Sequence, residues 1–188
     1  MLYWRPADIR AMEQAALTGG PQQDGERDAL LIRTLYVGAL RVSEALAMRP
    51  GDVGPGAMLQ VHRGKGGKPR PLGITPGLAD GLLAFAHRRR LQDRDRLFPV
   101  SRSTAWRMVR RAAQLAGCWR EGARPHLLRH SGAIERLRQH GNPRALQLHL
   151  GHNTLDMTMR YLTTLQVEDA VAINQAVDPE ALEITPRS

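Results

Sequence analysis

The chain has 188 residues, 42% of them hydrophobic, which is enough for one domain with a sizeable core and argues against wholesale disorder. Its 27 lysine and arginine residues exceed its 18 acidic residues by nine, and a pI near 11 indicates a polyanionic partner such as nucleic acid. One cysteine, Cys118, excludes a disulfide framework and a cysteine-built metal cluster. No run approaches the roughly 20 apolar residues that cross a bilayer, and the first residues lack the pattern of a secretory leader, so we expect a soluble, cytoplasmic protein.

The first part of the chain predicts three helices. Residues 6–17 have a proline at an early helical position and two glycines that close the segment. Asp24 is a candidate N-cap for a second helix over residues 24–38, whose leucines and valine follow helical spacing. Residues 41–48 predict a third helix, which ends before the sequence Pro50-Gly51-Asp52.

Two short segments then predict an antiparallel hairpin. Residues 58–62 and 71–74 flank a turn rich in glycine and lysine. The proline at position 71 cannot donate a backbone hydrogen bond, which favours an edge strand.

The rest of the chain predicts helices. A helix begins at Thr75-Pro76, and another is capped by Ser101 or Ser103 and ends near Gly117. Further helical segments are predicted over residues 125–140, 143–151, 154–161 and 166–177. The expected class is α+β, mainly α, with one small antiparallel sheet.

Positive charge is concentrated between residues 86 and 124, where eleven arginines face three acidic residues. A solvated helix face would explain this run, but arginine also pairs in bidentate fashion with phosphate oxygens. The interpretation we favour is contact with a nucleic-acid backbone, with these candidate residues: Arg102, Arg107, Arg110, Arg111 and, outside the run, Lys68.

The only two lysines, Lys65 and Lys68, lie in one turn, over residues 63–68. An ammonium group can release a proton, whereas a guanidinium group stays protonated. A chain that otherwise uses arginine therefore hints at a proton donor in this turn, with chance placement as the alternative.

Two histidines, His126 and His130, are four residues apart on a predicted helix. This spacing is found in zinc proteases, but that motif requires glutamate after the first histidine, and Leu127 stands there. We therefore predict no metal site. His126 and Arg129 share a helical face, and a proton-handling group beside a fixed cation suits a phosphate centre.

Two further clusters contain candidate site residues. Gly151 is expected to turn the chain and place His152 at a junction between helices, with Tyr161 on the helix that follows. Arg41 lies at a helix start among apolar residues, and Glu44 is positioned to hold its side chain. Taken singly, a capping His152 and a core-edge Tyr161 are adequate structural explanations.

Taken together, these segments resemble the catalytic domain of the tyrosine recombinase (phage integrase) family. The resemblance runs in order from about residue 6 to residue 177. Its elements are the Leu-Arg-Val-Ser-Glu-Ala-Leu segment at Arg41, the Gly-Lys-Gly turn at Lys65, the pair His126 and Arg129, the Leu-Gly-His segment at His152, and Tyr161. It implies a helical bundle with a small antiparallel sheet.

The resemblance also implies an activity, namely site-specific DNA recombination without metal or cofactor. Tyr161 would attack the scissile phosphate and form a 3′-phosphotyrosyl intermediate. Arg41 and Arg129 would bind the non-bridging oxygens, and Lys65 would protonate the 5′-oxygen leaving group.

The two histidines of the resemblance, His126 and His152, would bond the phosphate or help remove the tyrosine proton, and which of them is the base stays open. Glu44 would act only by supporting its neighbours. The partner implied is double-stranded DNA, on which the protein would form a homotetramer, with a monomer in isolation left open. No membrane is involved. The implied location is the cytoplasm, in association with the nucleoid, and the protein would be bacterial or encoded by a phage or plasmid.

The expected organisation is one catalytic domain over residues 1–177, followed by a polar tail over residues 178–188. The predicted helix over residues 166–177 would dock on a neighbouring subunit or, equally, on its own chain. Most members of the family also carry an N-terminal core-binding domain, which we expect to be lacking from this chain. A catalytic part of a longer protein and a naturally short recombinase both fit.

Two other functions remain open at this point. A type IB topoisomerase uses similar residues and relaxes DNA without partner subunits. A DNA-binding accessory protein with an inert site would need no strand cleavage. An RNA-binding domain is disfavoured because the chain has only eight aromatic residues for base stacking.

Overall fold

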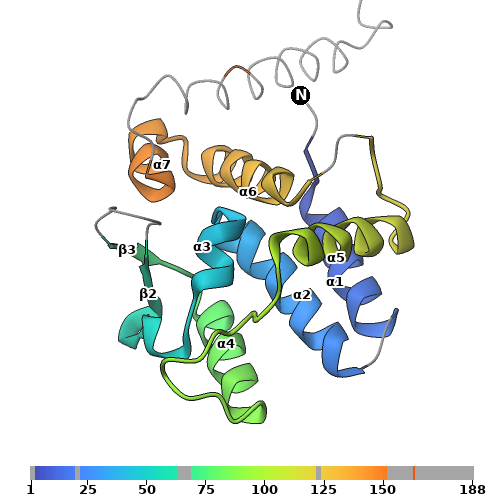
Figure 1. Ribbon diagram of the computed structural model, residues 1–188. Coiled ribbons are helices and arrows are strands. Elements are labelled where there is room, and N and C mark those ends of the chain that lie inside the picture. The colour runs from blue at the N-terminus through green and yellow to red at the C-terminus, as the bar shows by residue number, and fades with distance from the viewer. Residues whose placement is uncertain (1–2, 20–21, 63–68, 122–123, 152–162, 164–188) are drawn as a thin grey trace, which may run out of the picture. The chain divides into compact units, whose positions relative to one another are not determined.

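The computed structural model describes residues 3–19, 22–62, 69–121, 124–151 and 163 of the chain (Figure 1). The chain divides into two compact units. The larger unit runs to Glu135, and the described part of the other consists of residues 136–151 and 163.

The larger unit is mostly helical. Its helices are α1 (Pro6–Thr18), α2 (Gln22–Val37), α3 (Val42–Ala47), α4 (Pro76–Arg88), α5 (Arg102–Leu115) and the first part of α6 (Pro125–His140). Two of these helices, α4 and α5, have a side-chain cap at their first turn. Thr75 Oγ1 accepts from Leu78 N at 3.3 Å, and Ser101 Oγ accepts from Thr104 N at 3.1 Å.

The core of this unit lies among α1, α2, α4 and α5. Helix α1 packs against α2 and α5, and α2 also contacts α3 and α4 (Figure 1). Each helix contributes an apolar stripe at helical spacing, as Ala105, Val109 and Ala112 do on α5. The largest buried apolar side chains are Trp4, Met12, Leu31, Ile32, Leu35, Leu40, Leu59, Leu78, Leu82, Leu97 and Phe98.

A three-stranded antiparallel sheet completes the larger unit. Its strands are β1 (Val53–Gly54), β2 (Met58–Val61) and β3 (Arg70–Gly73), with the short 3-10 helices η1 (Pro50–Asp52) and η2 (Pro55–Ala57) beside β1. In the β2–β3 register Leu59 faces Leu72 and Val61 faces Arg70. Leu59, Val61 and Leu72 are buried, so this face of the sheet joins the core.

Hydrogen bonds from Trp4 tie the start of the chain to α6 and to the segment that follows α5. The Trp4 backbone N–H donates to Ser131 Oγ at 2.8 Å, and its indole Nε1 donates to the Cys118 carbonyl at 3.1 Å. Ser131 Oγ in turn donates to the Leu127 carbonyl at 2.7 Å. The start of the chain is thereby linked to the helix that carries His126.

The hairpin and the helices predicted within the described residues are confirmed, with two differences. Helix α2 begins at Gln22, so Asp24 lies within its first turn, where its carboxylate pairs with Arg27 at 2.8 Å instead of capping the helix. Strand β3 lies at the edge of the sheet, as Pro71 indicated. Strand β1 was not predicted, because two residues are too few to show an alternating pattern.

The described part of the second unit contains the end of α6 and helix α7 (Pro143–Leu150). Asn142 Oδ1 caps α7 by accepting from Ala145 N at 3.0 Å, and the helix ends at Gly151, whose φ of 63° is left-handed as predicted. The predicted helices over residues 154–161 and 166–177 lie outside the described residues. Within the ranges that the structure describes, no helix has the length and apolar character to span a bilayer.

Candidate active site

Arg41 and Glu44 are joined at the start of α3. Arg41 is the residue before the helix, and its backbone N–H donates to Glu44 Oε2 at 2.8 Å. Its guanidinium Nη1 donates to Glu44 Oε1 at 3.1 Å. A carboxylate three residues into a helix is well placed to bond the backbone at the helix start, so this local motif also fixes the arginine side chain. The predicted support of Arg41 by Glu44 is confirmed.

The Glu44 carboxylate is the centre of an arginine cluster. Arg70 Nη1 lies 3.6 Å from Glu44 Oε1, and Arg129 Nη1 lies 3.7 Å from Glu44 Oε2. The Glu44 side chain is only 4% exposed, whereas that of Arg41 is 41% exposed. Three guanidinium groups and one carboxylate give these four side chains a summed charge of +2, with Arg41 as the member most open to solvent.

Arg129 is held by the backbone as well as by Glu44. Its side chain is 1% exposed, and Nη1 donates to the Ala39 carbonyl at 2.6 Å. Ala39 has a φ of 46°, in the left-handed region that an alanine rarely adopts. This turn between α2 and α3 therefore brings the Ala39 carbonyl to Arg129 and Arg41 to the start of α3. A strained residue beside a charged cluster is typical of a functional site.

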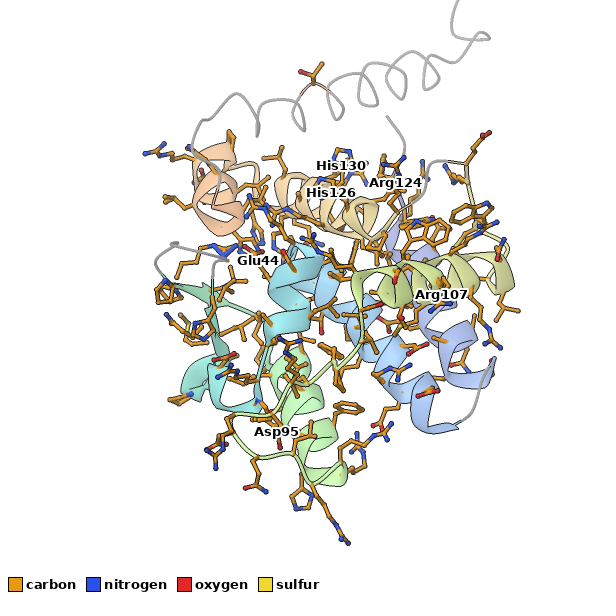
Figure 2. All side chains as sticks on the ribbon, in the orientation of Figure 1. Glu44, Asp95, Arg107, Arg124, His126 and His130 are labelled. Atoms are coloured by element: carbon orange, nitrogen blue, oxygen red, sulfur yellow. The ribbon has the colours of Figure 1, made fainter. Side chains whose placement is uncertain are left out.

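His126 lies on the first turn of α6, beside this cluster (Figure 2). The residue is exposed, yet desolvation of the ring by its neighbours lowers its pKa below the usual 6.5, and the charges of Arg129 and Arg41 lower it further. The imidazole is therefore neutral at neutral pH. A neutral ring can accept a proton or donate a hydrogen bond to a phosphate.

His130, one turn further along α6, provides a test of the electrostatics of this helix (Figure 2). Burial, with a contribution from His126, lowers its pKa from 6.5 to about 4. In the unfolded chain the His130 imidazole takes up a proton near pH 6.5, whereas in the folded chain it does so only near pH 4. The free energy of unfolding should therefore fall as the pH drops from about 6.5 to 4. The free energy of unfolding should fall by about 3 kcal/mol at most over this pH range.

Urea unfolding between pH 7 and pH 4.5 measures this dependence. The His130→Asn variant should lose stability less steeply over the window than the wild-type protein. His87→Asn, which removes an exposed histidine from α4, is the matched control. Equal slopes for wild type and His130→Asn would contradict the assignment.

The arginines predicted to contact DNA lie on α5, on the faces that its apolar stripe leaves free. Arg102 and Arg110 are exposed, and the Arg110 guanidinium carbon lies 5.3 Å from the ring centroids of both Trp106 and Trp119. Stacking between two indoles orients a guanidinium while leaving its edge donors open to a phosphate.

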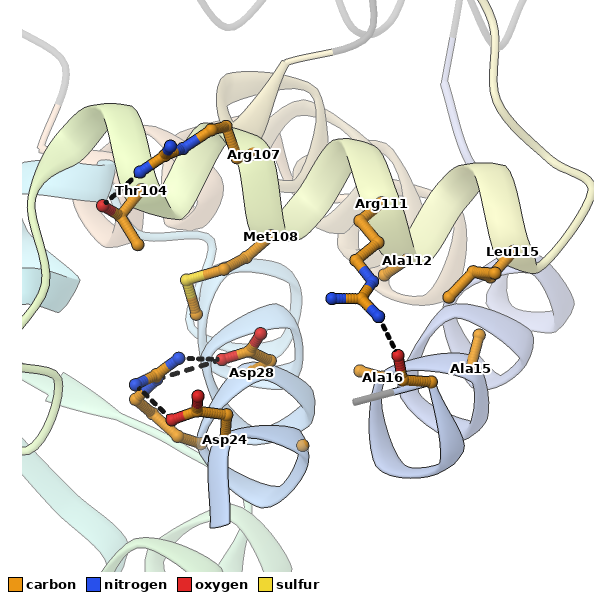
Figure 3. Close-up of a pocket in the computed structure, with 13 residues that line it drawn as sticks. Ala15, Ala16, Asp24, Asp28, Thr104, Arg107, Met108, Arg111, Ala112 and Leu115 are labelled. Carbon is orange, nitrogen blue, oxygen red and sulfur yellow. Dashed lines mark hydrogen bonds and ion pairs between the residues drawn. The ribbon is translucent and has the colours of Figure 1, made fainter. Parts of the chain in front are cut away.

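The other two α5 arginines, Arg107 and Arg111, make contacts within the protein. Arg107 donates to Thr104 Oγ1 at 3.2 Å, and Arg111 donates to the Gly19 carbonyl. Both line a pocket of about 220 Å³ between α1, α2 and α5 (Figure 3). The acidic residues of this pocket pair with Arg27, and it contains no member of the Glu44 cluster.

A comparison with protein families covers most of the chain. The model of the phage integrase family matches residues 4–168. The chain belongs to the phage integrase family. The matched range includes the whole cluster around Glu44.

Similar proteins are recombinases by name. A tyrosine recombinase of Pseudothermotoga lettingae is 34% identical over 155 residues, which cover 80% of this chain and 54% of the relative. Tyrosine recombinase XerC of Rhodospirillum centenum is 32% identical over 181 residues, 90% of this chain and 52% of the relative. This chain thus spans about half the length of these curated relatives.

Solved structures agree with the fold predicted for an integrase-family chain. The catalytic domain of bacteriophage HP1 integrase matches with a TM-score of 0.69 and 26% identity, over 95% of this chain and 98% of that one. The predicted class, mainly helical with a small antiparallel sheet, is therefore confirmed.

The structure brings together Arg41, Glu44, His126 and Arg129 of the predicted integrase site. The remaining predicted members, Lys65, Lys68, His152 and Tyr161, lie outside the described residues. Among the residues that are described, no three histidine, cysteine, aspartate or glutamate side chains gather as metal ligands. The expectation of metal-free chemistry stays a prediction.

Sequence reasoning missed Arg70 and Ala39. Arg70 stands two residues before the buried Leu72 on β3, so alternation along the strand places both on the inward face. An arginine on an inward strand position is a signal that could have been used. Nothing local in the sequence predicts a left-handed alanine at position 39.

Proposed function

We propose that this chain is the catalytic domain of a site-specific DNA recombinase. It cleaves and rejoins DNA strands through a 3′-phosphotyrosine intermediate formed by Tyr161. Support comes from membership of the phage integrase family and from relatives that are named tyrosine recombinases.

The observation that carries the proposal is the arginine cluster around Glu44. A phosphodiester bears one negative charge, and a second develops as a nucleophile adds to phosphorus. Side chains fixed before the reaction, with a summed charge of +2, would stabilise the added charge without reorganising. Arg41 is the member placed to contact the phosphate directly, since it is the most exposed.

Each bond change and proton transfer of the proposed cleavage step is assigned to a residue. The Tyr161 phenol oxygen forms a bond to phosphorus while the bond from phosphorus to the 5′ oxygen breaks. Lys65 gives its proton to the departing 5′ oxygen, and a histidine accepts the phenol proton. His126 is suited to that task because its lowered pKa keeps it neutral. Attack by the 5′-hydroxyl of a partner strand reverses these steps and rejoins the DNA.

The proposed partner is double-stranded DNA, on which the chain assembles as a homotetramer within the cytoplasm, at the nucleoid. The catalytic domain is assigned to residues 1–177, and residues 166–177 are assigned to contact with a neighbouring subunit. These assignments extend the resemblance to the family.

Trapping the covalent intermediate tests the proposed function. The protein is incubated in EDTA with a pool of nicked duplexes of random and inverted-repeat sequence. The short fragment that bears the freed 5′-hydroxyl then diffuses away, and rejoining fails. A protein–DNA adduct on a denaturing gel, mapped to Tyr161 by peptide mass, is the expected result. No adduct despite measurable DNA binding would count against recombination by this chain.

Salt dependence of DNA binding tests the basic surface. If four to six phosphates are contacted, log K should fall with a slope of about −4 to −5 against log salt concentration, because each contact releases condensed counterions. Fluorescence anisotropy with a labelled duplex between 50 and 200 mM salt, as rough limits, measures the slope. An affinity insensitive to salt would contradict the assignment.

Arg110→Ala should reduce the magnitude of this slope by about one, as expected for the loss of one phosphate contact. Arg88→Ala is the matched control, because Arg88 is an exposed arginine on α4 that pairs with Glu26. The control should keep the wild-type slope.

A further inference from the structure

Arg70 has no assigned role in the resemblance, yet it belongs to the cluster by geometry. It is the first residue of β3, opposite Val61 of β2, and its side chain is 13% exposed. Its Nη1 lies 3.6 Å from Glu44 Oε1, the same oxygen that accepts from Arg41 Nη1 at 3.1 Å. Two guanidinium groups from different elements therefore share one carboxylate oxygen.

The two arginines differ in what they can reach. Arg41 is 41% exposed and its side chain bonds Glu44 through a single nitrogen, Nη1, while its other side-chain nitrogens make no hydrogen bond or ion pair within the described residues. Arg70 is far less exposed and is fixed by the backbone pairing of its strand. A ligand in solvent can therefore contact Arg41, whereas Arg70 is largely buried beside the Glu44 carboxylate.

The sharing of one oxygen has an electrostatic effect. A buried carboxylate with few cations around it draws a flexible guanidinium into a two-bond, fork-like pair. A second cation beside Glu44 Oε1 weakens that pull and repels the Arg41 guanidinium toward solvent. The carboxylate can then orient Arg41 through one bond without capturing all of its donors.

We propose that Arg70 is a positioning residue of the active site, which balances the charge of Glu44 and so keeps the outer donors of Arg41 available to the scissile phosphate. The proposal rests on the proposed function. Arg70 acts through Glu44 and Arg41 and does not itself touch the reacting atoms.

Single-turnover cleavage of the trapping substrate tests this role. Arg70→Ala should cleave about 10- to 100-fold more slowly, by analogy with the loss of residues that orient metal ligands without touching the metal. The affinity for DNA should change less than about threefold, since no phosphate contact is lost. Arg70→Lys keeps the charge and should recover most of the rate. Wild-type rates in Arg70→Ala would overturn the proposal.

A double variant separates charge balance from a merely structural effect. Glu44→Gln removes the charge that captures Arg41, so Arg70→Ala should cost much less in the Glu44→Gln background than in the wild-type protein. Independent, additive losses would overturn the proposed coupling. Arg27→Ala, a half-buried arginine paired with Asp24 and Asp28, is the matched control and should leave cleavage unchanged.

A structural measurement that requires no enzymatic activity makes the test independent of the proposed function. In a crystal structure of Arg70→Ala, Arg41 should bond both oxygens of Glu44 through two side-chain nitrogens. An Arg41 that keeps its single bond would overturn the proposal even if the wild-type protein forms no adduct. Failure of the wild-type protein to form any adduct would count against the recombinase assignment alone.

Discussion

The Tyr161→Phe variant should form no covalent adduct with DNA while binding it as tightly as the wild-type protein. Phenylalanine has the same shape but lacks the oxygen that would bond to phosphorus, so the proposed reaction has no substitute nucleophile. The measurement combines a denaturing gel of the nicked-substrate reaction in EDTA with an anisotropy titration of the same duplex. An adduct in Tyr161→Phe would show that another residue is the nucleophile.

The other tyrosines provide the control for this experiment. The chain has three tyrosines, and Tyr3 and Tyr36 lie in the described larger unit. Tyr36→Phe should form the adduct at the wild-type rate, since Tyr36 is at the end of α2 and has no part in the proposed reaction. A loss of adduct in that variant would indicate a general effect of removing a phenol group.

Arg41→Ala and Arg129→Ala should each slow cleavage by roughly 100- to 1,000-fold. The estimate is the cost of removing one preorganised donor to a developing negative charge, about 3 to 4 kcal/mol of activation free energy. Single-turnover rates at saturating protein measure the effect without a contribution from binding. Near-wild-type cleavage by either variant would show that the arginine does not act on the reacting phosphate.

The two variants should differ in stability. Arg41 is 41% exposed, so its removal leaves the core intact, whereas Arg129 is 1% exposed and bonds the Ala39 carbonyl. Loss of Arg129 removes the donor to the Ala39 carbonyl and leaves the buried Glu44 carboxylate with one cation fewer. The melting temperature should therefore fall. Arg129→Lys, which preserves the charge, separates a catalytic loss from unfolding.

A neutral phosphate analogue gives a direct test of the charge argument. A methylphosphonate at the scissile position replaces one charged non-bridging oxygen with a neutral methyl group, so the transition state carries one negative charge instead of two. The rate ratio between wild type and Arg41→Ala should therefore be smaller on the methylphosphonate than on the natural diester. An equal ratio on both substrates would point to an effect of Arg41 on structure alone.

Much of the fold could be predicted because local signals agreed. Pro76 after Thr75, the serine at position 101 and Asn142 before Pro143 each mark a helix start that the structure confirms. The link between Arg41 and Glu44 was also accessible, since three residues of spacing at a helix start define it without help from the rest of the chain.

Features that depend on tertiary packing were not accessible. The alternation of β3 indicates that Arg70 points inward, but only the folded sheet reveals that Glu44 is the group it meets. The left-handed Ala39 likewise coincides with a bond that its carbonyl accepts from the distant Arg129, and it has no local cause in the sequence. Lys65, His152 and Tyr161 stay predictions.

Glu44 also links the competence of the site to the completion of folding. Its three arginines come from the start of α3, from β3 and from α6, segments separated by long stretches of chain. A nascent or partly unfolded molecule that lacks any one of these segments has no assembled guanidinium cluster. Under the proposed function, we therefore expect unfinished molecules to bind DNA through their exposed arginines without nicking it.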